Sequence, residues 1–308
     1  MQFSKIELLI FVSIRYFPNL ASKSSQMKAF LGMGLLGSNF VKAMLKKGEQ
    51  VQVWNRTASK AKDLEQYGAK AFENVSDAVK GADRIHLTLK DDASVNEVLE
   101  AASSGLMQGA IIIDHTTTSK EGAIQRTKLW KEKGFIYQHA PVFMGPVNAL
   151  EGTGFMMVSG DEELIGKLRP ELSKMTGKLL DFGQEVGKAA AIKLVGNAFL
   201  VCFTAGIRDT LALSKVLNVS VDDLFGLFNE WNPGAMLQGR LKRMTSGDYS
   251  QPSWELNMAR KDTGLFMEAA QKNETSLTLL PSIAKLMDEW IEKGYGNNDW
   301  TVIAKDLV

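Results

Sequence analysis

The sequence predicts an α/β fold, a doubly wound parallel sheet, followed by an all-helical C-terminal domain. Three features support this prediction. Short apolar runs alternate with helical segments over residues 27–187, and parallel strands need such crossover connections. A glycine-rich turn joins the first run to the first helix. From residue 188 onward, apolar residues recur at helical spacing as far as the C-terminus.

The predicted strands are short runs of apolar residues, some with the alternation of a half-buried strand. They occupy residues 28–31, 50–53, 69–72, 84–89, 110–114, 135–139, 155–159 and 178–182. Between them, apolar residues at helical spacing predict crossover helices, for example over residues 59–67, 93–102 and 119–133. We expect all of these strands to form one parallel sheet. Each crossover helix brings the chain back to the end of the sheet at which the previous strand began, so the next strand runs in the same direction.

The second domain is expected to be all-helical and to cover residues 188–308. It begins with an Ala- and Leu-rich helical pattern over residues 188–216 that is apolar on more than one face. Turn-forming residues at 218–220, 231–234 and 246–252 divide the remainder into separate helices. A helix with apolar residues on several faces packs against partners, so we expect this domain to bind substrate and to form oligomers.

The composition argues against several classes of protein. The chain of 308 residues carries 36 Lys and Arg against 35 Asp and Glu, which gives a formal net charge of +1. A nucleic-acid-binding protein usually has an excess of positive charge, so we expect no binding to nucleic acid. Its one cysteine, Cys202, cannot form an internal disulfide, so we expect a cytoplasmic protein. No group of Cys, His and Asp residues has the spacing of metal ligands, and we expect no metal.

Residues 1–26 precede the first predicted strand and are expected to lie outside the fold. Residues 5–14 are a mostly apolar run, too short to span a bilayer, which needs about 20 apolar residues. Glu7 interrupts the run and Lys5 is the only early basic residue, so the segment is a poor signal peptide. An extension ahead of a start at Met27, a targeting segment and a packed accessory segment are the alternatives. We expect no association with a membrane.

The glycine-rich turn has the pattern G-x-G-x-x-G and consists of Gly32, Met33, Gly34, Leu35, Leu36 and Gly37. Directly after a strand and at the start of a helix, this pattern binds dinucleotides. The first glycine makes the tight turn, the second lets the backbone approach a pyrophosphate, and the third lets helix and strand pack closely. The helix N-terminus adds unpaired N–H groups. The pattern therefore predicts a Rossmann-type cofactor domain over residues 27–187.

Residues at the end of the second predicted strand indicate which dinucleotide binds. A carboxylate about 20 residues after the glycines would bind the ribose hydroxyls of NAD. Asn55 stands at this place, followed by Arg56 and Thr57. Arg56 can pair with a 2′-phosphate, and Asn55 and Thr57 can donate hydrogen bonds to it. We therefore expect NADP(H) as the cofactor; the alternative is that Arg56 is a solvated loop cation.

A lysine and an asparagine interrupt the apolar start of the long helix. Lys193 and Asn197 are four residues apart, which places them on one face of a helix, one turn apart. Their neighbours are mostly Ala, Ile, Leu and Val, and burying polar groups among such residues without partners is costly. Spacing alone leaves two interpretations open. Either a polar cavity uses both residues, or the lysine reaches solvent beside a satisfied core amide.

Several motifs resemble, in order along the chain, those of the β-hydroxyacid dehydrogenase family. This family includes 3-hydroxyisobutyrate dehydrogenases and glyoxylate/succinic semialdehyde reductases. The resemblance runs from residue 27 to the C-terminus. It is carried by residues 30–37, 53–57, 113–117 and 140–142, by Gly187 with Lys193 and Asn197, and by residues 259–262 and 299–301.

The resemblance implies roles for individual residues. Lys193 matches the general acid–base of the family, and Asn197 matches a residue that holds the substrate. Thr117 matches a residue near the nicotinamide, and Lys261 matches a lysine of the helical domain that reaches the cofactor site. The resemblance also implies a C-terminal domain like that of 6-phosphogluconate dehydrogenase and a homodimer or homotetramer built through it. In the reducing direction, a protonated Lys193 would supply the proton to the carbonyl oxygen.

The expected substrate loop departs from the family pattern. The family usually continues Pro-Val-Ser-Gly-Gly, whereas this chain has Phe143, Met144 and Gly145 after Val142. Two bulky apolar side chains in place of Ser and Gly suggest a more apolar or differently oriented substrate. Alternatively, both turn into the core and backbone N–H groups bind an acid. Thr116 stands where the family often has Ser, and either hydroxyl can bind the substrate.

Together these features predict an NADPH-dependent oxidoreductase that interconverts a small aldehyde or keto acid and the corresponding hydroxy compound. An imine reductase is one alternative, although such enzymes usually carry another residue where Lys193 stands. A non-catalytic NADP-binding regulatory module is another, and relatives of that kind lose the lysine. The three histidines, His86, His115 and His139, are expected to be structural.

Overall fold

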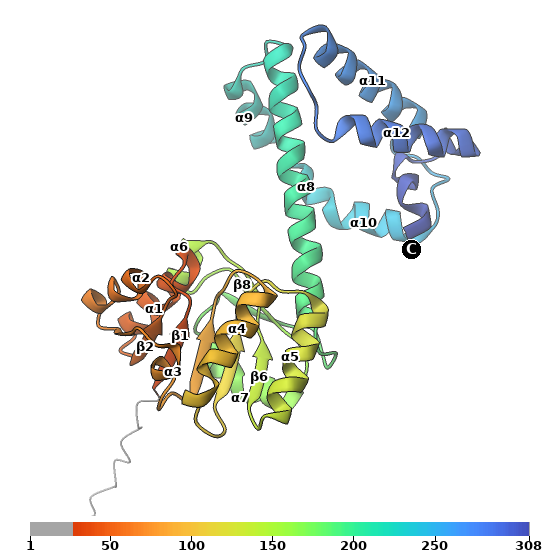
Figure 1. The fold of residues 1–308 in the computed structure, drawn as a ribbon. Helices are drawn as coiled ribbons and strands as arrows, with labels where there is room; N and C mark the ends of the chain where they lie inside the picture. The colour runs from red at the N-terminus through yellow and green to blue at the C-terminus, as the bar shows by residue number, and fades with distance from the viewer. Residues whose placement is uncertain (1–26, 308) are drawn as a thin grey trace, which may run out of the picture. The chain divides into compact units, whose positions relative to one another are not determined.

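The computed structural model describes residues 27–307 (Figure 1), and the chain divides into two compact units after Leu194. The first unit holds all the described strands, and the second is built of helices and the segments that join them. The division lies within the long helix α8 (Lys188–Val216), a few residues beyond the boundary expected at residue 188. The expectations for residues 1–26 concern a segment outside the described residues.

Six parallel strands form the main sheet of the first unit, in the order β3-β2-β1-β4-β5-β6. They are β1 (Lys28–Leu31), β2 (Val51–Trp54), β3 (Lys70–Phe72), β4 (Arg84–Leu87), β5 (Ile111–Asp114) and β6 (Ile136–His139). From β1 the chain moves outward through β2 and β3, then returns to place β4 on the other side of β1. Such a switch point opens a crevice at the carboxyl ends of β1 and β4. The predicted α/β fold is confirmed.

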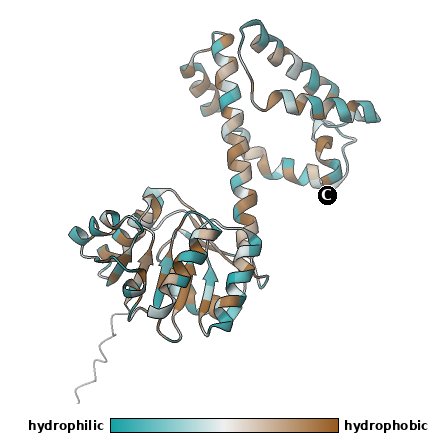
Figure 2. Cartoon of the chain, in the orientation of Figure 1, coloured by the Kyte–Doolittle hydropathy of each residue, from teal (hydrophilic) through white to brown (hydrophobic). Residues whose placement is uncertain are grey.

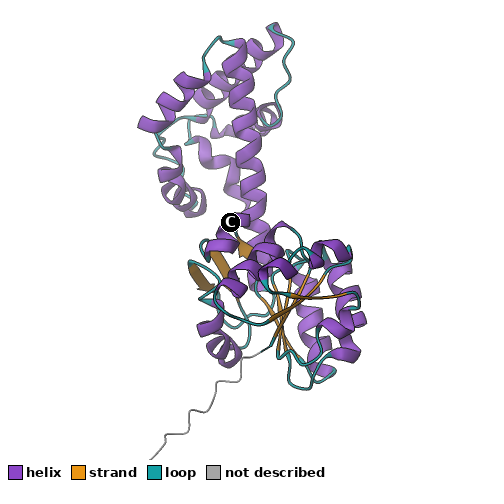
Figure 3. Cartoon of the chain, turned by 90° about the vertical axis from the view of Figure 1, so that its left-hand side faces the viewer, coloured by secondary structure: helices purple, strands orange, loops and turns teal. Residues whose placement is uncertain are grey.

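Helices flank both faces of this sheet (Figure 3). They are α1 (Leu35–Lys46), α2 (Ala58–Lys62), α3 (Val75–Ala78), α4 (Asp92–Ala102), α5 (Lys120–Glu132), α6 (Pro146–Glu151) and α7 (Glu162–Leu172). Side chains alternate along each strand, which produces two apolar clusters. Phe30 joins the cluster that includes α1 and α7, whereas Ala29 and Leu31 join the cluster that includes α4 and Trp130 of α5. Because both faces are buried, the strands read as nearly continuous apolar runs.

The remaining three strands form a separate sheet, which corrects the expectation of one sheet. In it, β8 (Phe155–Val158) pairs antiparallel with β7 (Val142–Phe143) and parallel with β9 (Lys178–Asp181). Only Ala140 and Pro141 separate β6 from β7, and these are too few for a crossover to a parallel neighbour. The chain therefore leaves the main sheet after β6, and β7 is a strand that the apolar pattern does not predict.

The second unit contains the rest of α8, then α9 (Val221–Glu230), α10 (Leu237–Ser246), α11 (Leu256–Lys272) and α12 (Leu280–Trp290). Its apolar cluster includes Leu256, Trp290 and Val302, which come from α11, α12 and the C-terminal segment. Asp209 of α8 is buried and accepts hydrogen bonds from the Leu279 N–H at 2.7 Å and from the next N–H along the chain. This carboxylate therefore ties α8 to the start of α12.

The part of α8 that belongs to the second unit is apolar and largely uncovered (Figure 2). Val195, Phe199, Phe203, Ile207 and Leu211 follow one another at intervals of four residues and are between 46% and 72% exposed. Residues four apart are neighbours on a helix surface, so these five form a continuous apolar row that winds around the helix, the α8 stripe. By length and composition α8 is also apolar enough to cross a membrane, with a mean hydropathy of 1.7 in its most apolar stretch.

Candidate active site

The glycine-rich turn lies between β1 and α1, at the switch point of the main sheet. Gly32 has a φ of +100°, and a Cβ there would lie 2.1 Å from the Thr88 carbonyl oxygen, so only glycine fits. A Cβ on Gly37 would lie 2.0 Å from the Gly32 carbonyl oxygen. Gly34 is the N-cap of α1, and beyond its chain neighbours no described atom would lie within 4 Å of a Cβ there. Open space beside an N-terminus that no side chain caps fits a pyrophosphate.

A groove of about 410 Å³ lies beside this turn at the carboxyl ends of β1, β2 and β4. The glycines of the turn line it together with three cations, Arg56, Lys60 and Lys90. Arg56 is exposed, as the predicted phosphate contact must be. Sequence patterns do not single out Lys60 or Lys90, because only the fold brings α2, which carries Lys60, and the loop after β4, which carries Lys90, to the same groove. The volume and the positive charge suit the phosphate-bearing end of a dinucleotide.

Asn55 holds the turn in place and also lines the groove, and its predicted role as a donor to the cofactor stays a prediction. Its side-chain oxygen accepts a hydrogen bond from the Met33 N–H at 2.9 Å, and its side-chain nitrogen donates to the Thr57 carbonyl at 2.9 Å. Both ends of the amide are thus engaged by backbone, and Asn55 ties the glycine turn to the loop after β2. Thr57 itself is exposed. Within the turn, Met33 is buried, Leu36 packs against the core and Leu35 is exposed.

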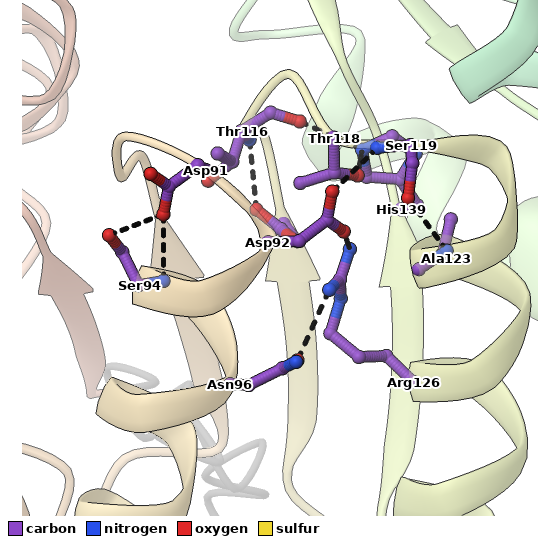
Figure 4. Close-up of polar contacts among 12 residues, drawn as sticks. Asp91, Asp92, Ser94, Asn96, Thr116, Thr118, Ser119, Ala123, Arg126 and His139 are labelled. Carbon is purple, nitrogen blue, oxygen red and sulfur yellow. Dashed lines mark hydrogen bonds and ion pairs between the residues drawn. The ribbon is translucent and has the colours of Figure 1, made fainter.

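Thr116 joins the loops that follow β4 and β5 (Figure 4). It is buried, and its hydroxyl accepts a hydrogen bond from the Leu89 N–H at 2.9 Å. Its own N–H donates to Asp114 at 2.8 Å. The Thr116 hydroxyl thus accepts a hydrogen bond within the protein and keeps its own O–H donor, and its predicted contact with the substrate stays a prediction. Thr117 is exposed at the carboxyl end of β5, and its place near a nicotinamide stays a prediction.

An ion pair between a buried arginine and a half-buried aspartate anchors the same loop from the helical side (Figure 4). Arg126 of α5 is 2% exposed, and its Nη2 lies 2.8 Å from Asp92 at the start of α4. The other Asp92 oxygen accepts a hydrogen bond from the Ser119 N–H at 2.9 Å. Arg126 Nε donates to the Tyr137 hydroxyl at 2.9 Å, and this hydroxyl donates to Asp114 at 2.6 Å. Because each buried charge is paired and hydrogen-bonded, the network holds the loop after β5 at both ends.

The three histidines are buried in the first unit, as expected for structural residues. His86 Nδ1 lies 3.0 Å from His115 Nε2, and His115 Nδ1 lies 2.9 Å from the Ala140 carbonyl oxygen. His139 Nε2 lies 2.8 Å from the Thr116 carbonyl oxygen. Burial is the main cause that lowers the pKa of all three rings, that of His115 to about 3. At pH 7 they are neutral hydrogen-bonding groups beneath the loop after β5.

Lys193 lies near the start of α8, in the first unit. It is 7% exposed, and burial lowers the pKa of its amine to about 8. Its Nζ lies 4.0 Å from the centre of the Phe143 ring. Asn197 follows one turn later on the same face of α8 and is half-buried. The structure thus brings two of the predicted substrate-site residues, Lys193 and Phe143, into direct contact.

Residues 143–145 separate into three environments. Phe143, at the end of β7, is half-buried and faces the lysine amine. Met144 is half-buried and packs against the core of the first unit, as in the alternative of turning into the core, and its predicted contact with the substrate stays a prediction. Gly145 is exposed and is the N-cap of α6.

Lys261 belongs to the second unit and lies on α11. It is exposed, and its Nζ lies 3.0 Å from Asp262. Its reach to the cofactor stays a prediction. Within residues 27–307, no group of three His, Cys, Asp or Glu side chains is placed to hold a metal ion.

Known sequences resemble this chain over most of its length. Residues 28–183 match the model of the NAD binding domain of 6-phosphogluconate dehydrogenase. A 3-sulfolactaldehyde reductase of Escherichia coli is 26% identical over 287 residues, which cover 91% of this chain and 95% of the relative. An NAD-dependent L-serine dehydrogenase of Pseudomonas aeruginosa is 28% identical over 294 residues, which cover 90% and 96%.

Solved structures share the fold. An imine reductase from Myxococcus stipitatus in complex with NADP+ has a TM-score of 0.83 at 20% identity, and the match covers 92% of this chain and 100% of that one. At this level of identity the likeness concerns the fold alone. The match to the cofactor-domain model, by contrast, includes the glycine-rich turn and the loops after β4 and β5.

Proposed function

Because the chain belongs to the β-hydroxyacid dehydrogenase family, whose cofactor domain is that of 6-phosphogluconate dehydrogenase, we propose that it is an NADPH-dependent reductase of a small aldehyde or keto acid. The family makes the chain an NAD(P)-binding oxidoreductase that acts on hydroxyl or carbonyl groups. The observation that carries the proposal further is Lys193, a buried amine whose pKa of about 8 suits proton transfer near neutral pH.

Lys193 is the proposed acid. When bound, the dinucleotide supplies a hydride to the carbonyl carbon. Negative charge then develops on the carbonyl oxygen, and the Lys193 ammonium donates a proton to it. With a pKa of about 8 the amine is mostly protonated at pH 7, and above pH 8 it can accept the proton of a hydroxyl in the reverse direction. Asn197, on the same helix face, offers an amide to hold the same oxygen.

The groove beside the glycine-rich turn supports NADPH as the cofactor. Gly34 leaves space for a pyrophosphate. Arg56, Lys60 and Lys90 line the groove together with one carboxylate, that of Glu97, so positive charge is in excess. A 2′-phosphate adds two negative charges, which pair with cations better than ribose hydroxyls do. One relative is an NAD-dependent enzyme by name, so the cofactor preference proposed for this chain rests on these side chains alone.

The second unit is the proposed site of assembly into a homodimer or homotetramer. The α8 stripe is exposed, and Phe225 and Phe228 of α9 add further exposed apolar surface. Apolar patches of this kind mark protein interfaces, and a second copy of the chain is the occupant we propose. The α9 residues favour a folded partner over a bilayer, because α9 has only ten residues and carries two aspartates in its first turn. We also propose a cytoplasmic location, where the exposed Cys202 thiol stays reduced.

The test is a substrate panel with NADPH and NADH as alternative reductants. Glyoxylate, succinic semialdehyde, a longer apolar aldehyde and a cyclic imine are each supplied to the purified protein, and cofactor oxidation is followed by absorbance. We expect turnover of an aldehyde or keto acid, faster with NADPH than with NADH. Turnover of the imine alone would replace the proposal with imine reduction. Tight NADPH binding without turnover of any compound would identify a binding module.

A further inference from the structure

We propose that Phe143 is a positioning residue for Lys193, and that its ring face holds the lysine ammonium and stabilises its charged form. The inference rests on the proposed role of Lys193 as the acid. The Nζ of Lys193 lies 4.0 Å from the centre of the Phe143 ring, within the range of about 6 Å over which an aromatic face attracts a cation. The attraction is strongest for a desolvated cation, and Lys193 is 7% exposed.

The backbone around Phe143 fixes the place of its ring. Phe143 pairs with Phe155 in the antiparallel register of β7 and β8. The Met157 N–H donates to the Pro141 carbonyl at 2.9 Å, which extends the pairing by one more bond. Val142 is buried on the opposite face of the strand, so alternation directs Phe143 away from the core and toward the amine. The ring is therefore presented from a paired strand and not from a free loop.

An aromatic face suits an acid that must give up its proton. A carboxylate partner would accept hydrogen bonds from the ammonium and hold the proton strongly. The face of a benzene ring attracts the positive charge through its quadrupole and is a much weaker hydrogen-bond acceptor. An ammonium held this way keeps its charge, and the charged amine is the form that gives a proton to a substrate oxygen. Burial lowers the pKa of Lys193. In this proposal the ring acts in the opposite direction, because it attracts the charged form of the amine.

Charged groups near the start of α8 come from α5, from the loop before α8 and from α8 itself. They are Lys120, Glu185 and Lys188. Lys120 and Glu185 pair with each other at 2.6 Å, and Lys188 is exposed. Residues 142–145 of β7 and the turn after it carry no charge, so the ring is what this part of the chain contributes to the amine.

The experiment measures the titration of Lys193 directly. Reductive methylation with ¹³C-formaldehyde labels lysine amines for NMR, and Lys193→Arg identifies the signal of Lys193. We expect Phe143→Leu to lower the midpoint of this signal by about half to one pH unit, because the charged form loses the ring face. Phe143→Trp should raise the midpoint or leave it unchanged, since indole attracts cations best. The matched control is Phe155→Leu, which removes a ring that is 47% exposed on the neighbouring strand and should leave the midpoint unchanged.

Equal midpoints in the wild type, Phe143→Leu and Phe143→Trp would overturn the inference. If Phe143→Leu does not fold, a midpoint in Phe143→Trp below that of the wild type overturns it equally. The pH dependence of kcat/KM for reduction separates the inference from the proposed function. If Lys193 is the acid, the loss of rate at high pH should move to lower pH in Phe143→Leu by the same amount as the NMR midpoint. A shifted NMR midpoint with an unmoved rate profile would refute the role of Lys193 as acid and leave the contact with Phe143 intact.

Discussion

The two units of this chain differ in how completely each covers its own side chains. In the first unit, apolar residues such as Phe30 and Ile113 are fully buried, and the buried charge of Arg126 has its partners within the unit. In the second unit, the α8 stripe lies exposed along a helix, although α11 and α12 share a small core. The first unit therefore encloses its own core, whereas the second presents an apolar surface for which a second copy of the chain is the proposed partner.

The largest effect is expected on turnover, from replacing the residue of the first unit that is the proposed acid. Lys193→Ala removes the proposed acid, and general acid catalysis contributes about 10²–10⁴-fold to rates. We expect kcat to fall by that factor, while the Kd for NADPH, measured by fluorescence titration, stays within about twofold because the glycine groove is untouched. Lys188→Ala, which removes an exposed lysine of the same helix, is the control. Turnover retained in Lys193→Ala would contradict the assignment.

The next effect tests whether the second unit lacks a partner surface. Phe199→Glu places a charge in the middle of the α8 stripe, where a buried carboxylate would cost several kcal/mol. We expect the dimer or tetramer to dissociate at concentrations at which the wild type is assembled, as measured by analytical ultracentrifugation. Lys215→Glu, near the end of the same helix, changes a charged position outside the stripe and should leave assembly intact.

The same measurement separates a protein partner from a bilayer. A wild-type protein that is monomeric in buffer and binds vesicles or detergent through α8 would show that a bilayer, and not a second copy, covers the stripe. Assembly that is insensitive to Phe199→Glu would place the interface elsewhere.

Cofactor selection provides a smaller effect in the first unit. Arg56→Ala removes a cation that can form charge-assisted hydrogen bonds to a 2′-phosphate, each worth about 1.5–3 kcal/mol. We expect the Kd for NADPH to rise by about tenfold to a hundredfold, with the Kd for NADH nearly unchanged. Lys62→Ala removes an exposed cation of α2 that pairs with Glu73 and does not line the groove, so it should have no effect. Equal NADPH affinity in Arg56→Ala and wild type would sink this prediction.

The smallest effect is expected on the stability of the two units at acid pH, which should differ between them. All three histidines of the chain lie in the first unit, and burial lowers the pKa of each, that of His115 to about 3. Between about pH 6.5 and pH 3 the unfolded chain binds protons that the folded rings do not, so the free energy of unfolding falls as pH decreases. We expect the melting temperature of the first unit to drop by several degrees between pH 7.5 and pH 5.

Calorimetry, with hydrogen exchange to assign the transitions, measures this drop. The second unit, which has no histidine, should shift less over the same range. Stability of the first unit that is flat between these pH values would show that the buried rings do not control it.

Local sequence patterns were sufficient to predict the helices and strands whose apolar residues recur at regular spacing. The strands around Phe30 and Ile113 and the helix that carries Lys193 follow from apolar spacing, and the turn at Gly32 follows from its glycines. The pairing of β7 with β8 does not follow, because a two-residue strand has no period of its own. Its existence depends on the short connection through Pro141, which prevents a parallel return to the main sheet.

The site shows the same division between local and tertiary information. Arg56 and Thr117 are exposed, and their predicted contacts with the cofactor stay predictions. Thr116 and Asn55 also bind backbone groups, among them those of loops distant in the sequence, and these contacts do not follow from the sequence patterns. The sequence offers both side chains as donors or acceptors, and only the fold determines which neighbour takes them.

The continuity of α8 restricts how the two halves of this protein can be recombined. The helix has 29 residues, and at 1.5 Å per residue it is about 43 Å long. A fragment that ends at Leu194 would leave Lys193 in a final turn whose carbonyl groups lack partners and fray. A natural or engineered exchange of C-terminal domains between relatives would therefore have to keep α8 whole, and the donor of that helix would bring with it the lysine proposed as the acid.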